Sequence, residues 1–188
     1  MSVNTTVAKL LASLAKTDQA MRKRQWKQVE KLNNEYRDHT NPRYRKGVAK
    51  LVTEMKTVDG KSTNALKKIV KTHGWPRVSL VGKKGAYNAW LLAQHATHNL
   101  KFQKSCLVLL ELAVKERQAD PAQLALLKDR VLVQEGKNQV YGTQFKSNKR
   151  GEMVPFPTRD KARLDVRRAK MNLGPFADYC MKMGRPII

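Results

Sequence analysis

Apolar residues recur at helical spacing through most of this 188-residue chain, and this periodicity constrains the fold more than any other feature. Near the start, Val7, Leu10, Leu11 and Leu14 follow the i, i+3, i+4, i+7 pattern of one helix face. Only residues 139–156 have a strand-like composition, enough for one hairpin at most. The sequence therefore predicts a mainly α protein, a single helical domain of about seven to eight helices with one small extended or hairpin element near 139–156.

Turn and cap signals divide the periodic pattern into separate helices. Asn41-Pro42 ends the first helix, Asp59-Gly60 is a turn signal, and 80–85 reads as a glycine-containing loop. Asp120-Pro121 places an N-cap before a proline at the first helical position. The expected helices lie at residues 7–32, 44–57, 63–73, 86–96, 102–116, 121–134, 159–173 and 175–183.

Two regions of different character are expected within this domain. Residues 1–40 form a basic N-terminal helix that packs on the core or extends from it, and residues 41–188 form a helical core that carries a polar pocket. No apolar run approaches the roughly 20 residues of a membrane span. Cys106 and Cys180 are too few for a disulfide framework, so we expect reduced thiols and a cytoplasmic protein.

The net charge of +23 points to a polyanionic partner, most commonly nucleic acid, RNA or DNA. The excess is greatest in residues 1–50, which hold 12 Lys and Arg against 4 Asp and Glu. Trp26, Tyr36 and Tyr44 lie among these cations and are candidates for stacking on bases, with core packing as the alternative for Trp26. The candidate phosphate contacts are Arg22, Lys23, Arg24, Lys27, Arg43, Arg45 and Lys46.

Residues 74–144 carry more polar, aromatic and glycine residues than a helical scaffold requires, which predicts a pocket. His95 is the best candidate for acid–base chemistry, because the unperturbed pKa of histidine lies near neutrality. Asp129 is a candidate to orient His95, and Arg130 a candidate to hold an anion. We expect these three and Tyr141 to converge as a catalytic group, the alternative being a buried ion-pair network that braces helices.

Further polar residues are candidates for ligand contacts. An extended segment would place Gln139, Tyr141 and Thr143 on one side, which suits recognition of a polar ligand, although a structural turn is the alternative. Gly82 and Gly85 flank two lysines before a helix N-terminus that can bind anions. The expected ligand-binding residues are Gln94, Gln139, Thr143, Gln144, Lys83 and Lys84. No cofactor motif and no set of metal ligands with diagnostic spacing is present, so none of either is expected.

Taken jointly, several motifs resemble a widespread bacterial domain family of unknown function. They are Gly74-Trp75-Pro76, Val81-Gly82, Ala89-Trp90-Leu91-Leu92 leading to Gln94-His95-Ala96, Asp129-Arg130-Val131 and Gln139-Val140-Tyr141-Gly142-Thr143-Gln144, with Asp18-Gln19 and Arg22 upstream and Arg168 and Tyr179 downstream. The resemblance covers residues 8–183 and implies no activity. Thr97 and Asn99 stand where it leads us to expect acidic residues.

The leading functional hypothesis is a nucleic-acid-binding protein, with RNA as one possible target, whose polar pocket is a candidate catalytic site. One alternative is an enzyme, a hydrolase or transferase, that acts on a small anionic ligand. A second alternative is a structural or assembly protein that packs nucleic acid on its basic surface.

Overall fold

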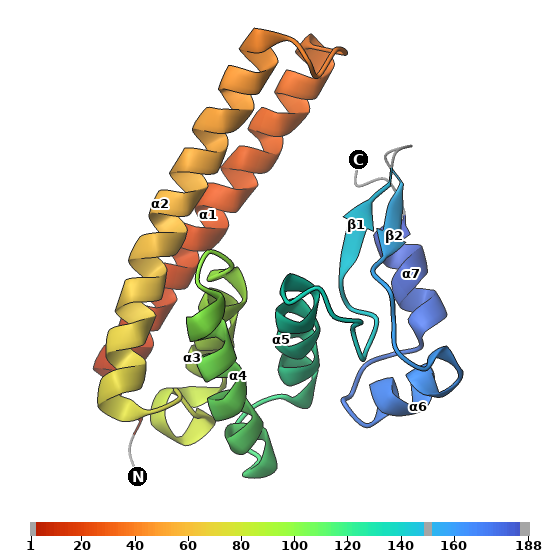
Figure 1. Cartoon of the computed structure of the whole chain (residues 1–188). Helices are drawn as coiled ribbons and strands as arrows, with labels where there is room; N and C mark the ends of the chain where they lie inside the picture. Colours follow the sequence, from red (N-terminus) through yellow and green to blue (C-terminus); the bar gives the residue numbers. More distant parts are fainter. Residues whose placement is uncertain (1–2, 149–151, 185–188) are drawn as a thin grey trace. The chain divides into compact units, whose positions relative to one another are not determined.

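The computed structural model describes residues 3–148 and 152–184, and this part of the chain is mainly helical, as the periodicity predicts (Figure 1). It contains seven α-helices, one short 3-10 helix and one two-stranded sheet. The elements are α1 (Thr5–Glu35), α2 (Pro42–His73), α3 (Val78–His95), α4 (Leu100–Lys115), α5 (Pro121–Gln134), β1 (Phe145–Ser147), β2 (Met153–Pro155), η1 (Lys161–Arg163), α6 (Leu164–Ala169) and α7 (Phe176–Gly184).

The chain forms two compact units, Met1–His98 and Asn99–Ile188. The first unit consists of α1, α2 and α3, and the second contains all the later elements. The expected boundary after residue 40 does not coincide with this division, because α1 packs against both α2 and α3 within the first unit. The proposed basic helix is thus one part of a three-helix unit.

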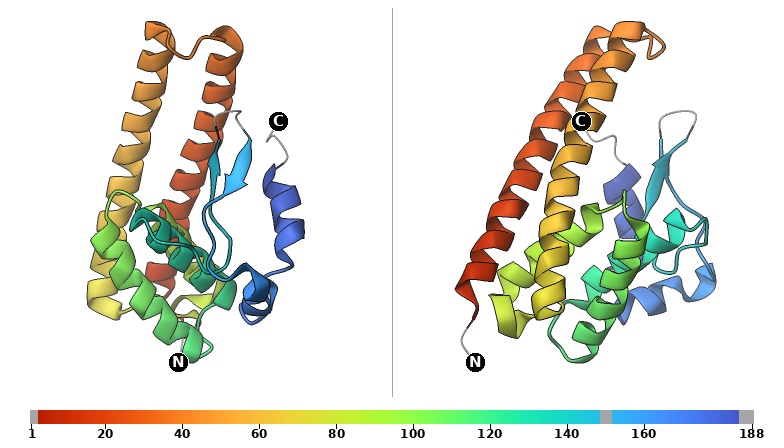
Figure 2. Two further views of the ribbon diagram at one scale, coloured as in Figure 1. Left: turned by 45° about the vertical axis from the view of Figure 1, so that its right-hand side comes forward. Right: turned by 60° about the vertical axis from the view of Figure 1, so that its left-hand side comes forward.

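Helices α1 and α2 form a long antiparallel hairpin and lie side by side in both views of Figure 2. Each begins at an asparagine N-cap: the Asn4 side chain accepts from the Val7 N–H, and the Asn41 side chain accepts from the Arg43 N–H. Pro42 follows Asn41 at the first helical position, where its missing N–H costs nothing. Asn41-Pro42, which was predicted to end the first helix, begins α2, whereas α1 already ends at Glu35.

Helix α2 is continuous through Asp59-Gly60, so the predicted break between helices at 44–57 and 63–73 is wrong. Asp59, Ser62 and Thr63 are buried, and the Asp59 carboxylate accepts a 2.6 Å hydrogen bond from Arg22 of α1. Tertiary packing of this face thus overrides the turn propensity of Asp-Gly, which amounts to only about 1 kcal/mol per residue.

The predicted loop at 80–85 is helical, with a kink at Gly82, whose φ of 71° and ψ of 168° interrupt α3. A side chain would be strained at that φ, which explains a glycine at this position. Helix α3 runs parallel to α1, since the Asn4 N–H donates to the Leu80 carbonyl at one end and His95 contacts Asp18 near the other. The second part of α3, from Lys83 to His95, therefore lies along the first half of α1.

In the second unit, α4 and α5 pack against each other around Cys106, Leu110, Leu124 and Leu127. Asp120 caps α5 by accepting from the Ala122 N–H, which confirms the predicted helix start. Strands β1 and β2 pair antiparallel, with Lys146 opposite Val154, and confirm a small hairpin in the expected region. Residues 149–151 lie outside the described part.

The helix predicted at 159–173 is shorter than expected and is divided into η1 and α6. Asp160 and Asn172 adopt positive φ angles of 42° and 54°, which limit the helical segment at both ends. Cys106 is buried, Cys180 is half-buried, and both are free thiols. Within the described residues, no helix has both the length and the apolarity that crossing a membrane requires.

Candidate functional site

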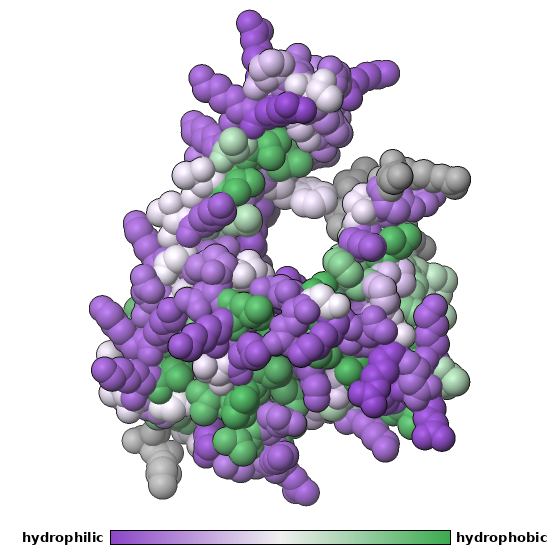
Figure 3. All heavy atoms as spheres, in the orientation of Figure 1, coloured by the Kyte–Doolittle hydropathy of each residue, from purple (hydrophilic) through white to green (hydrophobic). Residues whose placement is uncertain are grey.

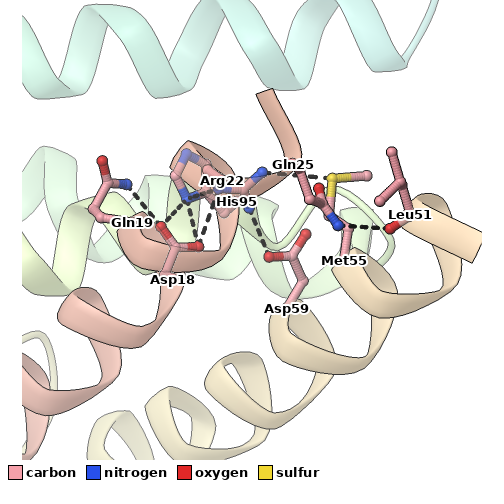
Figure 4. Close-up of polar contacts among 8 residues, drawn as sticks. All are labelled: Asp18, Gln19, Arg22, Gln25, Leu51, Met55, Asp59 and His95. Atoms are coloured by element: carbon pink, nitrogen blue, oxygen red, sulfur yellow. Dashed lines mark hydrogen bonds and ion pairs between the residues drawn. The ribbon is translucent and has the colours of Figure 1, made fainter. Parts of the chain in front are cut away.

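A cluster of charged side chains lies inside the first unit, where α1, α2 and α3 meet (Figure 4). Its members are Asp18 and Arg22 of α1, Asp59 of α2 and His95 at the last turn of α3. Leu11, Ala15 and Asp18 are all buried along one side of α1. Because this apolar side packs against α3, the Asp18 carboxylate lies fully buried in the interior of the unit.

Asp18 binds the imidazole of His95 through both of its oxygens, each 2.9 Å from Nδ1. The Asp18 side chain has no solvent exposure, whereas that of His95 is 21% exposed. Gln19 donates to the second Asp18 oxygen at 2.8 Å. Asp18 is therefore a carboxylate in position to orient His95, and the sequence did not single it out for this role.

The guanidinium group of Arg22 joins all three helices. Its Nε lies 3.2 Å from the Asp18 carboxylate and 3.0 Å from His95 Nδ1, and one of its terminal nitrogens donates to Asp59 at 2.6 Å. The other terminal nitrogen lies 3.6 Å from the Met55 sulfur. Arg22 thus differs from the other predicted phosphate contacts, because its donors are directed into the protein.

The environments of the two carboxyl groups shift their pKa values in opposite directions. Burial tends to raise the pKa of Asp18, but the hydrogen bond and charge of His95, together with the charge of Arg22, outweigh it and hold this pKa below the ordinary value. At Asp59 burial prevails over the attraction of Arg22 and raises the pKa. Both carboxyl groups are bound to Arg22, and the contact with His95 distinguishes Asp18 from Asp59.

The hydrogen bond that His95 forms depends on whether its Nδ1 carries a proton. When Nδ1 carries a proton it donates to Asp18, and when Nδ1 carries a lone pair it accepts from the Arg22 Nε–H. Throughout the described ranges, all polar contacts of His95 involve Nδ1. With Nδ1–H bound to Asp18, Nε2 carries the lone pair, as a general base requires.

In the second unit, Asp129 organises the loop that follows α5. Its fully buried carboxylate accepts from the N–H groups of Val140, Tyr141 and Thr143 at 2.7–3.1 Å, and from the Thr143 hydroxyl at 3.0 Å. Burial is the largest influence on Asp129 and raises its pKa, although these hydrogen bonds oppose the shift. The contacts occupy both carboxylate oxygens and support the structural alternative for Asp129.

Gln139 has a similar structural role. Its buried amide nitrogen donates to the Gln144 and Phe156 carbonyls, and its oxygen accepts from the Gln144 N–H. The Gln144 side chain in turn donates to the Thr143 hydroxyl. These three predicted ligand-binding residues therefore bind one another and the adjacent backbone, and the segment 139–144 is an ordered loop outside the strands.

Arg168 is an internal residue that the chemistry of the sequence alone did not single out. It is 1% exposed, donates to the Tyr141 carbonyl at 2.6 Å and to the Gly174 carbonyl at 2.7 Å, and lies 5.0 Å from the centre of the Tyr179 ring. Its place in the quoted family pattern was the available signal. A buried arginine that binds backbone carbonyls fixes this loop against α6 and α7.

The remaining predicted site residues have varied positions. Gln94 is buried in α3, Arg130 and Tyr141 are half-buried, and Lys83 and Lys84 are exposed directly after the Gly82 kink. His95 belongs to the first unit and Asp129, Arg130 and Tyr141 to the second, so the convergence of these four side chains stays a prediction. The described residues hold no group of three or more His, Cys, Asp or Glu side chains placed to bind a metal ion.

The basic residues of the α1–α2 hairpin are concentrated toward its outer end, which carries mostly hydrophilic side chains on the face in Figure 3. Residues 22–50 contain ten Lys and Arg against three Asp and Glu. Arg24 pairs with Glu54 across the hairpin at 2.9 Å. Six of the seven predicted phosphate contacts are exposed: Lys23, Arg24, Lys27, Arg43, Arg45 and Lys46.

The aromatic residues of this end differ in exposure. Trp26 is 48% exposed, which excludes the alternative that it is a core residue. The Tyr44 ring stacks on His39 with centroids 4.5 Å apart, and its hydroxyl donates to Asn33. Trp26 is thus the more accessible of these two rings.

Comparison with known proteins places the chain in a family without assigning an activity. No curated protein and no solved structure matches it. A family model does match residues 7–185, almost the whole chain. The protein belongs to this family, described as a family of unknown function, DUF6624.

Proposed function

We propose that the protein binds single-stranded nucleic acid, RNA in particular, through the outer end of the α1–α2 hairpin. The observation that carries this proposal is the exposed Trp26 between Lys23 and Lys27. These residues stand at positions i, i+3 and i+4, so they share one face of α1. An aromatic ring between two cations suits a base that stacks while its neighbouring phosphates are neutralised.

Helix α2 carries a second basic face at the same end of the hairpin. Arg43, Lys46 and Lys50 are spaced at i, i+3 and i+7 and are exposed, so they also share a helix face. Two carboxylates lie near these cations. Glu54 is bound to Arg24, and the exposed Glu30, at i+4 from Trp26, shares the face of Lys23 and Lys27. A strand that crosses the hairpin would meet positive charge on both helices, which favours binding through phosphates without dependence on base sequence.

Fluorescence anisotropy with a labelled single-stranded RNA of about 12 nucleotides tests this proposal. The double variant Lys23→Gln/Lys27→Gln should weaken binding and reduce the slope of log K against log salt by about 0.7 for each phosphate that is no longer neutralised. Lys68→Gln/Lys71→Gln is the matched control, because it removes two exposed charges from the inner half of α2. Equal weakening of RNA binding by the two double variants, or no RNA binding at low salt, would refute the proposal that RNA binds at the outer end of the hairpin.

A second candidate function is acid–base catalysis on a small anionic substrate, favoured by the contact of Asp18 with His95 Nδ1. In this function Asp18 orients the ring, while Nε2 removes or delivers a proton. Hydrolysis of bis-p-nitrophenyl phosphate, followed against pH, provides a first assay. His95→Gln should abolish the turnover and Asp18→Asn should lower it, and an unchanged rate in His95→Gln would exclude His95 from the reaction.

A further inference from the structure

A groove of about 370 Å³ lies between α1 and the second part of α3, apart from the basic end of the hairpin. One wall consists of residues at positions i, i+3, i+4 and i+7 of α1, and the other has the same spacing on α3. The lining residues are Ala12, Ala15, Lys16, Gln19, Lys84, Tyr87, Asn88 and Leu91. The volume lies at the lower end of the range for small-molecule sites and is too small for a folded nucleic acid.

The charge of the groove favours an anion. Lys16 and Lys84 line opposite walls and are both exposed, and no acidic residue belongs to the lining. Among the described residues, neither lysine forms an ion pair. The helix restarts at Lys83 after the Gly82 kink, so the positive end of its dipole lies beside Lys84.

Asn88 adds a polar group to the wall of the groove. The residue is 7% exposed and lines the groove, and its side-chain amide makes no hydrogen bond in the part of the chain that the structure describes. The atoms of this amide are accessible to solvent, so its donors and acceptor are open to the groove. An unpartnered amide on the wall of a groove is therefore a group to which a ligand can bind.

An aromatic ring completes the groove. Tyr87 is 47% exposed and its ring lies against the buried Trp90, with centroids 5.4 Å apart and planes inclined by 49°. Trp90 supports one side of this ring, and the exposed part can stack on a flat ligand. The two lysines can bind a phosphate, the aromatic ring can stack on a planar base, and the amide can bind a polar group. The groove thus has the groups that a nucleotide requires.

We propose that the α1–α3 groove binds a mononucleotide. Its phosphate lies between Lys16 and Lys84, its base stacks on Tyr87, and Asn88 binds a polar group of the base or sugar. Gln19 links this groove to the charged cluster, because it lines the groove and donates to Asp18. His95 stands one helical turn beyond Leu91 on α3, so the bound nucleotide occupies the approach to the Asp18–His95 pair.

Isothermal titration of the full chain with AMP, with adenosine and inorganic phosphate as separate ligands, tests this site. We expect saturable binding of one AMP, competition by phosphate, and weaker binding of either part alone. Lys84→Gln should weaken AMP binding at least tenfold, and Lys83→Gln provides the matched control, because this neighbouring lysine is outside the groove. Equal effects of the two variants, or no saturable binding, would overturn the proposal.

Two further variants separate this site from general attraction of anions. Asn88→Leu should weaken AMP binding while its melting temperature is unchanged or higher, because the substitution breaks no hydrogen bond and places an apolar side chain of similar size on the wall of the groove. Lys23→Gln/Lys27→Gln should leave AMP binding unchanged even where it weakens RNA binding. A fall in AMP affinity in this double variant would locate the nucleotide on the hairpin and refute the groove.

Discussion

Asp18 and His95 are separated by 77 positions in the sequence, yet both carboxylate oxygens lie 2.9 Å from the imidazole Nδ1. The sequence made Asp129 a candidate partner for His95, and the family resemblance led us to expect acidic residues at positions 97 and 99. Thr97 and Asn99 are not acidic, and Asp129 is occupied by its own loop. His95 thus has a buried carboxylate partner supplied by the first helix of the chain.

The first prediction concerns this pair and pH. The pKa of Asp18 is lower in the folded protein than its ordinary value of 3.8, so the unfolded chain binds the proton more readily. The stabilisation by Asp18 is therefore complete above that value and is lost as the pH falls through the folded pKa. Asp18→Asn should be less stable than the wild type at neutral pH, by about 1–3 kcal/mol.

Urea unfolding at neutral pH and at pH values below 4 checks this expectation. The difference in the free energy of unfolding between wild type and Asp18→Asn should decrease as the pH falls, because the variant lacks the titrating carboxyl group. A gap of constant size would mean that Asp18 contributes through packing and not through its charge.

The second prediction tests whether α2 is continuous. Gly60 lies inside the helix, and a methyl group built on it meets no atom within 4 Å. Gly60→Ala should therefore stabilise the protein by about 0.5–1 kcal/mol, since alanine loses less conformational entropy in a helix. Thermal unfolding measures the change, and destabilisation would favour a turn at Asp59-Gly60.

The third prediction concerns the tight approach of the loop at 142 to α7. Gly142 has a φ of 67°, and a methyl group there would lie 2.6 Å from the Phe176 ring. Gly136 has a similar φ of 72° but open space around it. Gly136→Ala should cost about 1–2 kcal/mol from backbone strain alone, and Gly142→Ala should cost more. Equal destabilisation of the two variants in chemical denaturation would show that Phe176 moves aside freely.

The fourth prediction addresses Asp129. Asparagine has nearly the same shape but would place an N–H₂ group against the donors of Tyr141 or Thr143. Asp129→Asn should therefore lower stability by about 1–3 kcal/mol. Hydrogen exchange should accelerate at Val140, Tyr141 and Thr143, and unchanged protection of these amides would contradict the structural role.

The sequence was a good guide to the helices and a partial guide to the site. Periodicity located most helices, and the Asp120 cap was predicted correctly. Asp59-Gly60 misled because a local turn preference is weak beside the packing of a long buried face. The signal for Asp18 was present, since it continues the apolar stripe of Leu11 and Ala15, but a single sequence does not reveal its distant partner.

Polar clusters were the hardest feature to interpret. Gln139, Thr143 and Gln144 have the side chains of a ligand site, yet they satisfy one another and the backbone. Ligand binding and loop bracing require the same donors and acceptors, so residue type does not separate them. Trp26 presents a related difficulty. Aromatic residues usually contribute to cores, so only the structure, in which this ring is exposed, excludes the core-packing alternative.

The parallel course of α1 and α3 has a consequence for how the protein folds. Helices α1 and α2 are joined by a short turn and can pair early, whereas α3 must return to the beginning of α1, closing a loop of more than 70 residues. We expect docking of α3 to be the later event. Before α3 docks, Asp18 lacks its contact with His95 and the groove lacks the wall that α3 provides. A nucleotide added during refolding should therefore bind only after α3 has docked on the hairpin. Once bound, it should slow the undocking of α3.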